Sequence, residues 1–193
     1  MKKAILLAAA ACAAAISAQA IVVSPITGPD FYALEGSDAF TVRAKDFGKS
    51  GDGDLYLGNG NLGLAANRVE ANHNWQAVNS FSLTYDAVSG LVSAMVGATV
   101  LQDTFEAGLT INALALQIRD NDLNYGFALN NLVINGQAYG NIGTVPNGDT
   151  FVSVSDLPAG SFSISGDLVI DTGYSKKGEN AKIELKAFGE KSS

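Results

Sequence analysis

The stretch Ser80-Phe81-Ser82-Leu83-Thr84-Tyr85-Asp86 decides the fold class, because large apolar and small polar side chains alternate along it. Successive side chains of a β-strand point to opposite faces of a sheet, so this pattern predicts one buried face and one solvated face. The tetrapeptide Ala87-Val88-Ser89-Gly90 follows, and its glycine can adopt the positive φ that a tight turn requires. We therefore expect the chain to reverse there and to pair with Leu91–Val96 as an antiparallel hairpin.

Similar alternation recurs along most of the chain and is interrupted at short intervals by Gly, Asn, Asp or Pro. Repeated short strands and turns are typical of an all-β domain, and no window predicts a helix convincingly. We expect an antiparallel β-sandwich or jelly roll, because no crossover helices of a parallel sheet are predicted. The clearest expected strands are Phe40–Ala44, Arg68–Gln76, Ser80–Asp86, Leu91–Val96, Leu114–Arg119, Tyr125–Asn130, Phe151–Ser155, Ser161–Asp171 and Ala181–Phe188.

Local signals predict details of these strands. Asn135-Gly136 predicts a type I′ turn between Leu132–Ile134 and Gln137–Tyr139, because both residues tolerate positive φ. Residues 146–149 predict a further turn, and Gly166 is interpreted as a β-bulge where its strand bends.

The last expected strand has one apolar and one charged face. Ile183 and Leu185 are expected to point toward the core, whereas the other face carries Lys182, Glu184 and Lys186. We expect these charges on an open face to discourage pairing with another chain. Residues 176–180 and the tail 189–193 are expected to be solvated and mobile.

The first twenty residues, MKKAILLAAAACAAAISAQA, have the parts of a secretory signal peptide: two lysines, a short apolar run and an Ala18-Gln19-Ala20 cleavage site. The apolar run is shorter than the ~20 residues that cross a bilayer, so a retained membrane anchor is not expected. Lipidation of Cys12 is an alternative hypothesis for the leader. We expect a signal peptide over residues 1–20, one β-sandwich domain over 21–188 and a flexible tail over 189–193.

Composition argues against several classes of function. The chain has 12 basic and 19 acidic residues, and loss of the two leader lysines leaves 10 against 19, a net charge of −9. This charge repels nucleic acid and anionic lipid. The exported part has no cysteine and one histidine, which argues against disulfides, a zinc site and a Ser-His triad. We therefore predict that the protein is not an enzyme.

One loop region is a candidate calcium site. It combines glycines with oxygen-bearing side chains, and Ca²⁺ takes six to eight oxygen ligands from a backbone that can fold around it. The spacing does not match an EF-hand, because Tyr56 occupies the next ligand position. The alternative interpretation is a pair of turns flanking a short strand, Leu55–Leu57. The candidate ligands are Asp52, Asp54, Asn59 and Asn61.

His73 and Trp75 are the only residues of their kind in the chain. They share one strand face with Val69 and Ala71, so we expect both to lie in the core. The alternative for the pair is a surface platform on which a sugar ring stacks.

Two pairs of carboxylates invite comparison with glycoside hydrolases, which need two carboxyl groups across a cleft. One pair is Asp120 and Asp122, and the other is Asp167 and Asp171. Neither pair has apolar neighbours in sequence that would raise a pKa. We expect all four side chains to be solvated.

Several stretches resemble a known family. Gly53–Gly63 leading into Asn67–Trp75 is similar to the opening of bacterial choice-of-anchor domains of type W. Phe81–Asp86 with Gly90–Ser93, and then Leu129–Gly136, resemble the later hairpins of that group. The resemblance implies an exported β-sandwich of the bacterial surface and implies no enzyme activity or site residues. Many such proteins have a PEP-CTERM sorting tail, but this sequence ends KIELKAFGEKSS, so covalent anchoring is not expected.

We therefore expect a secreted or cell-surface protein, with the periplasm as the alternative compartment. Its expected role is structural or adhesive, in the extracellular matrix or a biofilm, through polysaccharide or a surface protein. A carbohydrate-binding module is one alternative, with sugar rings stacked on Tyr125, Tyr139 and Tyr174. A fibre subunit is another, in which Ile21–Ile26 inserts into a neighbour's sheet, with Pro25 at an edge. An enzyme that uses carboxylates alone is the last alternative.

Overall fold

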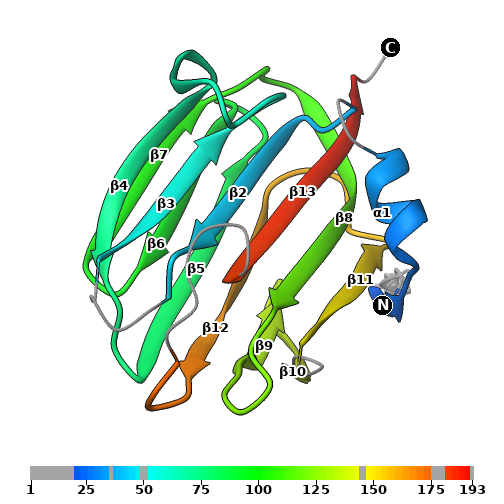
Figure 1. Ribbon diagram of the computed structural model, residues 1–193. Helices are drawn as coiled ribbons and strands as arrows, with labels where there is room; N and C mark the ends of the chain where they lie inside the picture. Colours follow the sequence, from blue (N-terminus) through cyan, green and yellow to red (C-terminus); the bar gives the residue numbers. More distant parts are fainter. Residues whose placement is uncertain (1–19, 35–36, 48–51, 144–146, 175–180, 192–193) are drawn as a thin grey trace, which may run out of the picture.

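Two antiparallel sheets pack face to face in the computed structural model, which describes residues 20–34, 37–47, 52–143, 147–174 and 181–191 (Figure 1). This arrangement confirms the predicted antiparallel β-sandwich. The expected leader with Cys12, Pro146 of the expected turn and residues 176–180 lie outside the described residues. Within the described ranges, no helix has the length and hydrophobicity needed to span a membrane.

In each sheet, several neighbouring strands come from distant parts of the sequence. The seven-stranded sheet contains, in spatial order, β1 (Val22–Pro25), β11 (Gly148–Ser155), β8 (Leu109–Asp120), β13 (Ala181–Lys191), β2 (Phe40–Lys45), β3 (Asp52–Gly58) and β4 (Arg68–Asn74). The six-stranded sheet contains β10 (Gln137–Gly143), β9 (Phe127–Ile134), β12 (Phe162–Ile170), β5 (Val78–Asp86), β6 (Leu91–Val96) and β7 (Thr99–Thr104).

Strand β13 lies in the middle of the seven-stranded sheet, between β8 and β2. Ile183 and Leu185 point toward the core, as predicted. The expected open face is wrong, because Lys182, Glu184 and Lys186 are only 7%, 3% and 4% exposed. Sequence alternation shows which residues share a face, but the cover on that face comes from residues distant in sequence, such as Arg43 of β2 and Phe31 of the helix Gly28–Ala33.

The expected tail is also corrected. β13 continues to Lys191, which pairs with Leu109 of β8, so residues 189–191 belong to a strand. Residues 192–193 lie outside the described residues.

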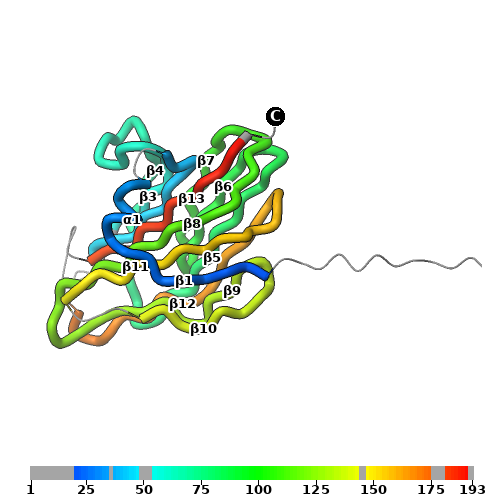
Figure 2. The backbone as a smooth tube through the Cα atoms, turned by 90° about the vertical axis from the view of Figure 1, so that its right-hand side faces the viewer, coloured from blue at the N-terminus to red at the C-terminus, as the bar shows by residue number. Residues whose placement is uncertain are grey.

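The two sheets approach each other along both sides of the sandwich. β4 and β7 lie side by side at one edge, and β1 and β10 lie at the other (Figures 1 and 2). The Tyr139 hydroxyl of β10 donates a hydrogen bond to the Ile21 carbonyl at 3.2 Å. β1 pairs with β11 of its own chain and has Pro25 at the sheet edge. The segment that the fibre hypothesis requires to be free is therefore occupied within its own sheet.

Turn chemistry agrees with the sequence-based expectations. Asn135 and Gly136 have φ values of 49° and 79°, which a type I′ turn requires, and Gln137 pairs with Ile134. Gly90 has φ 73° in the turn between β5 and β6. The pairing of β12 with β9 shifts between Ser165 and Asp167, which confirms a bulge at Gly166.

The expectation that no helix forms is wrong, because α1 (Gly28–Ala33) is a short α-helix. Thr27 caps it: the Thr27 hydroxyl accepts from the Asp30 backbone N–H, and the Asp30 carboxylate accepts from the Thr27 backbone N–H. Six residues are too few to show helical periodicity. Phe31 is fully buried with its ring centroid 5.4 Å from that of Phe151, which holds α1 on the outer face of β8 and β11.

Several further elements differ from the expected list. β7 was not expected, β3 extends beyond Leu55–Leu57 at both ends, and a 3₁₀ turn (Ala65–Asn67) precedes β4. β7 follows β6 through a turn in which Gly97 has φ 54°. A single pair of turn residues, 97–98, was too weak a signal to separate two strands.

Replacing Gly166 with alanine is expected to destabilise the fold by about 1–3 kcal/mol, because the added carbon overpacks the bulge. A Cβ at this position would lie 2.8 Å from the Asn130 carbonyl oxygen and 3.0 Å from ring carbons of Phe81. Urea denaturation measures the change. The control is Gly143→Ala, whose Cβ would have no neighbour within 4 Å. Equal stability of the two variants would contradict the close approach at Gly166.

Candidate functional site

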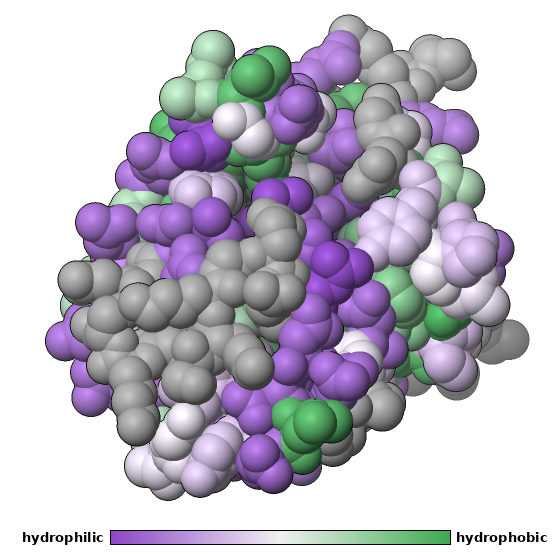
Figure 3. All heavy atoms as spheres, in the orientation of Figure 1, coloured by the Kyte–Doolittle hydropathy of each residue, from purple (hydrophilic) through white to green (hydrophobic). Residues whose placement is uncertain are grey.

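The outer face of the seven-stranded sheet is charged, but its charges pair with one another. The Glu184 carboxylate accepts from Arg43 Nε at 2.6 Å and lies 2.6 Å from Arg43 Nη2. The ammonium groups of Lys182 and Lys186 lie 3.7 Å and 3.6 Å from the same carboxylate. Figure 3 shows this face as largely hydrophilic where its atoms are described. These charged side chains form ion pairs with one another within the sheet, so the face does not present unpaired charges at this cluster.

Asp54 belongs to the same paired surface. Its carboxylate accepts from the Tyr56 hydroxyl at 2.9 Å and lies 3.3 Å from Lys45 Nζ. Burial alone would raise the pKa of the Asp54 carboxyl, but the Tyr56 hydrogen bond and the Lys45 charge outweigh burial and lower that pKa.

The structure does not gather the four calcium candidates around one point. Asp52 and Asp54 lie at the start of strand β3, whereas Asn59 and Asn61 lie beyond its far end. Five extended residues at ~3.3 Å each separate Asp54 from Asn59 by roughly 16 Å. The Asn61 side-chain oxygen accepts from the Gly63 backbone N–H at 2.8 Å. The expected calcium loop is therefore corrected to a strand followed by a turn.

The described part of the chain also contains no group of three His, Cys, Asp or Glu residues placed to share a metal ion.

The three tyrosines proposed for sugar stacking do not form one platform. Tyr174 is 2% exposed, and its hydroxyl donates to Asp120 Oδ1 at 3.0 Å, so its expected exposure is wrong. Burial, followed by the nearby Asp120 charge, raises the pKa of the Tyr174 hydroxyl. The Tyr139 hydroxyl donates its hydrogen bond to the Ile21 carbonyl. Tyr125 is exposed, but it lies alone among the three at the surface.

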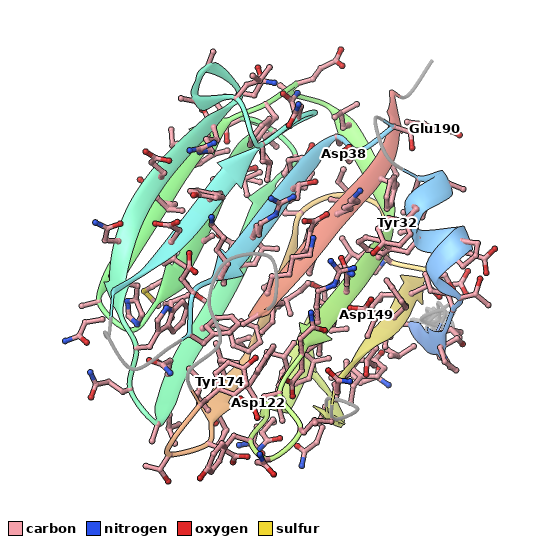
Figure 4. All side chains as sticks on the ribbon, viewed as in Figure 1. Tyr32, Asp38, Asp122, Asp149, Tyr174 and Glu190 are labelled. Carbon is pink, nitrogen blue, oxygen red and sulfur yellow. The ribbon has the colours of Figure 1, made fainter. Side chains whose placement is uncertain are left out.

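Asp120 and Asp122 are buried, so the expectation that they are solvated is wrong. Asp120 Oδ1 accepts from the Asp122 backbone N–H at 2.9 Å as well as from Tyr174, while Asp120 Oδ2 has no hydrogen-bond partner among the residues that the structure describes. Asp122 Oδ1 accepts from the Asn124 backbone N–H at 3.0 Å. Asp122 and Tyr174 lie near each other at one end of the sandwich in Figure 4. These hydrogen bonds hold the loop between β8 and β9. Aspartate side chains often accept from the backbone N–H two residues later in a turn, so this role could have been predicted from the sequence.

The second pair of carboxylates also accepts hydrogen bonds from neighbouring segments of the chain. Asp167 accepts from the Asn131 side-chain amide at 2.9 Å, and Asp171 accepts from the Gly126 backbone N–H at 2.8 Å. Asp171 is exposed, as expected, and Asp167 is half-buried. Each carboxylate therefore has a local structural partner.

His73 and Trp75 are buried, which confirms their expected place in the core. Their ring centroids lie 4.6 Å apart in an edge-to-face arrangement. His73 Nδ1 lies 2.9 Å from the Thr99 hydroxyl, and Nε2 lies 3.3 Å from the Asn79 side-chain oxygen. The pair fixes β4 against β7 and β5 and offers no surface for a sugar ring.

The outer face of the six-stranded sheet is different, because short uncharged side chains from four strands align on it. Ser163 of β12 lies opposite Thr84 of β5, Thr84 opposite Ser93 of β6, and Ser93 opposite Gln102 of β7. Neighbouring strands are ~4.8 Å apart, so this row spans roughly 14 Å. The Gln102 side-chain amide donates to the Ser93 hydroxyl at 3.3 Å.

A second row lies beside the first. Ser165 lies opposite Ser82, Ser82 opposite Met95, and Met95 opposite Val100. Met95 is 38% exposed and Val100 is 50% exposed. We call the two rows together the hydroxyl face, which consists of Ser82, Thr84, Ser93, Met95, Val100, Gln102, Ser163 and Ser165.

The hydroxyl face is the candidate functional site, since it is regular and contains no charged side chain. Sequence reasoning missed it. Alternation indicated that Ser82 and Thr84 point to solvent, but the rows depend on the register of four strands. That register includes β7, which was not expected, and the non-local pairing of β12 with β5.

Comparisons with protein-family models and with curated proteins find no match for this chain. The resemblance to choice-of-anchor domains of type W therefore stays a prediction.

Replacing Asp54 with asparagine is expected to lower the free energy of unfolding at neutral pH by less than about 1 kcal/mol, because the pair is partly exposed. The folded pKa of Asp54 lies below its unfolded value of ~3.9, so the carboxylate stabilises the fold above that pH. The contribution disappears as the pH falls through the folded pKa. Urea unfolding of both proteins between neutral and strongly acidic pH measures the difference.

Tyr56→Phe provides the matched variant for this test. It removes the hydroxyl donor but leaves Lys45 beside Asp54, so part of the pH-dependent difference should remain. If the free energies of unfolding of the wild type and of Asp54→Asn differ by the same amount at every pH, the lowered pKa of Asp54 is ruled out.

Proposed function

We propose that this protein is an exported, non-enzymatic adhesive protein that binds uncharged polysaccharide through the hydroxyl face. The observation that supports this proposal is the set of aligned, uncharged and largely exposed side chains on four adjacent strands. The protein would act at the bacterial surface or in the extracellular matrix, including a biofilm. The periplasm is the alternative compartment.

The chemistry of the hydroxyl face suits a neutral sugar polymer. Serine and threonine hydroxyls and the Gln102 amide each both donate and accept hydrogen bonds, as sugar hydroxyls do. Binding between such surfaces requires no charge to be removed from water, which would be costly. Met95 and Val100 add apolar surface for the C–H groups of a sugar ring. Many weak contacts along a repeating polymer combine into useful avidity.

The distribution of charge supports the choice of a neutral partner. The expected exported chain has a net charge of −9, which disfavours acidic polymers and nucleic acid. The cations near Glu184 are paired within the seven-stranded sheet. The neutral hydroxyl face is therefore better suited to contact another molecule than the charged face on the opposite side.

Export is proposed from the N-terminal leader and from the resemblance to choice-of-anchor domains. Ile21, which directly follows the expected cleavage site, is buried, and its carbonyl accepts from Tyr139. Cleavage after Ala20 would therefore leave every described strand intact.

A surface protein is the competing partner for the same face. The same face also exposes Val78 and Leu91, which lie toward opposite ends of β5 and β6. Exposed apolar residues spread along one face favour contact with another protein. The binding experiment below separates the two partners.

The test is co-sedimentation of the mature protein with insoluble cellulose and mannan, and affinity electrophoresis in dextran and in alginate. Wild-type protein is expected to bind at least one neutral polymer and not the acidic alginate. Thr84→Lys places a long charged side chain in the first row and is expected to weaken that binding at least tenfold.

Asn72→Lys is the matched control, because Asn72 is exposed on β4 in the other sheet. It should bind within twofold of wild type, and thermal melting should show that both variants fold. Failure to bind any neutral polymer, or equal binding by Thr84→Lys, would contradict the proposal. Capture of a surface protein in place of sugar, lost in Thr84→Lys, would favour the competing partner.

A further inference from the structure

The interior of the sandwich contains an apolar cavity of about 110 Å³ between the two sheets. Most of its walls are inward-facing apolar side chains from strands of both layers. Representative lining residues are Val42, Leu55, Leu83, Ala94, Leu116 and Leu185. Protein interiors normally contain few voids larger than a water molecule, so a cavity of this size requires an explanation.

Exposure along β13 gives independent support for the cavity. Ile183 and Leu185 point inward and are covered by the six-stranded sheet, yet both are only half-buried. Glu184 and Lys186 point outward and are more completely buried. In a sandwich without a cavity, the inward side chains would be more completely buried than the outward ones. The accessible surface of Ile183 and Leu185 is therefore surface that faces the cavity.

Small side chains explain why the centre is hollow. Ala44 of β2 and Ala94 of β6 line the cavity, whereas most of its other lining residues are leucine, isoleucine or valine. The surrounding strands are held by backbone pairing on both sides, so they cannot collapse into the missing volume. The void is a product of residue choice within a rigid frame.

The chemistry of the walls selects the occupant. A buried water molecule needs two to four polar partners, and Ser82 is the single polar residue among those that line the cavity. An apolar cavity of roughly 150 Å³ in another protein stays dry and binds benzene or xenon. The cavity described here is slightly smaller and equally apolar, so an apolar guest fits it better than water.

We propose that this cavity is a binding site for a small uncharged apolar molecule, no larger than an aromatic ring or a short branched hydrocarbon. Met95 and Ser82 line the cavity from β6 and β5, although their side chains belong to the outer hydroxyl face. The guest would lie between the sheets, whereas sugar would bind to the outer side of the six-stranded sheet.

Two probes test the site directly in the mature protein. Crystals pressurised with xenon should show a xenon atom between the sheets, among the lining residues. Benzene should raise the melting temperature in a concentration-dependent way, because a ligand that binds only the folded state stabilises it. Absence of both effects would overturn the proposal.

Variants distinguish the cavity from non-specific binding. Ala94→Leu fills the space and is expected to weaken benzene binding at least tenfold and to exclude xenon. Ala138→Leu adds the same carbons at an exposed position of β10 and should bind benzene within twofold of wild type. Ala44→Val is the smaller filling change if Ala94→Leu does not fold. Undiminished benzene binding by a folded filling variant would overturn the proposal.

The outcome is independent of the proposed adhesive role. Thr84→Lys alters the outer face of β5 and should leave benzene binding within twofold of wild type. Loss of polysaccharide binding alone would thus leave the cavity proposal standing, and loss of benzene binding alone would leave the adhesive proposal standing.

Discussion

Strand β13 determines which side chains meet across the middle of the seven-stranded sheet, because it pairs with β8 on one side and with β2 on the other. Its inward residues face the apolar interior, while Glu184 pairs with Arg43 on the outer face. A slip of one residue would exchange these two sets. It would place a carboxylate in the interior and leave its cation unpaired, and breaking a buried pair in this way costs about 3–5 kcal/mol. The register is therefore specified from both faces.

The outer faces of the two sheets differ in chemistry. On the seven-stranded sheet, long charged side chains reach one another across strands and neutralise one another. On the six-stranded sheet, the hydroxyl face instead holds serine and threonine side chains, which are too short to reach across strands as the lysines and Arg43 do. The same alternation points Ala44 and Ala94 into the space between the two sheets. Because both side chains are small, a cavity remains there.

Local features could be predicted from the sequence, because they depend on residues close together in the chain. Alternation in residues 80–86 predicted a strand and its buried face, and Asn135-Gly136 predicted its turn type. Features that depend on distant partners could not. The ion pair of Arg43 with Glu184 joins residues 141 positions apart, so the burial of that charge is invisible in either segment alone. Asp120 is buried for a similar reason, since Tyr174 comes from a distant loop.

The candidate site was harder to predict than the fold. Each serine of the hydroxyl face looks ordinary in sequence, and its significance lies in its alignment with residues on three other strands. The residues that looked chemically distinctive, such as His73, Trp75 and Tyr174, are buried and have structural partners. Residue type alone was therefore a poor guide to the surface, while alternation was a good guide to the core.

Cross-strand nuclear Overhauser effects along β13 test this register most directly. We predict contacts that place Glu184 opposite Gln117 of β8 and Arg43 of β2, with Leu185 opposite Leu116 and Val42. Contacts that place Leu185 opposite Gln117 and Arg43 would contradict the register on which the paired face and the seven-stranded wall of the cavity depend.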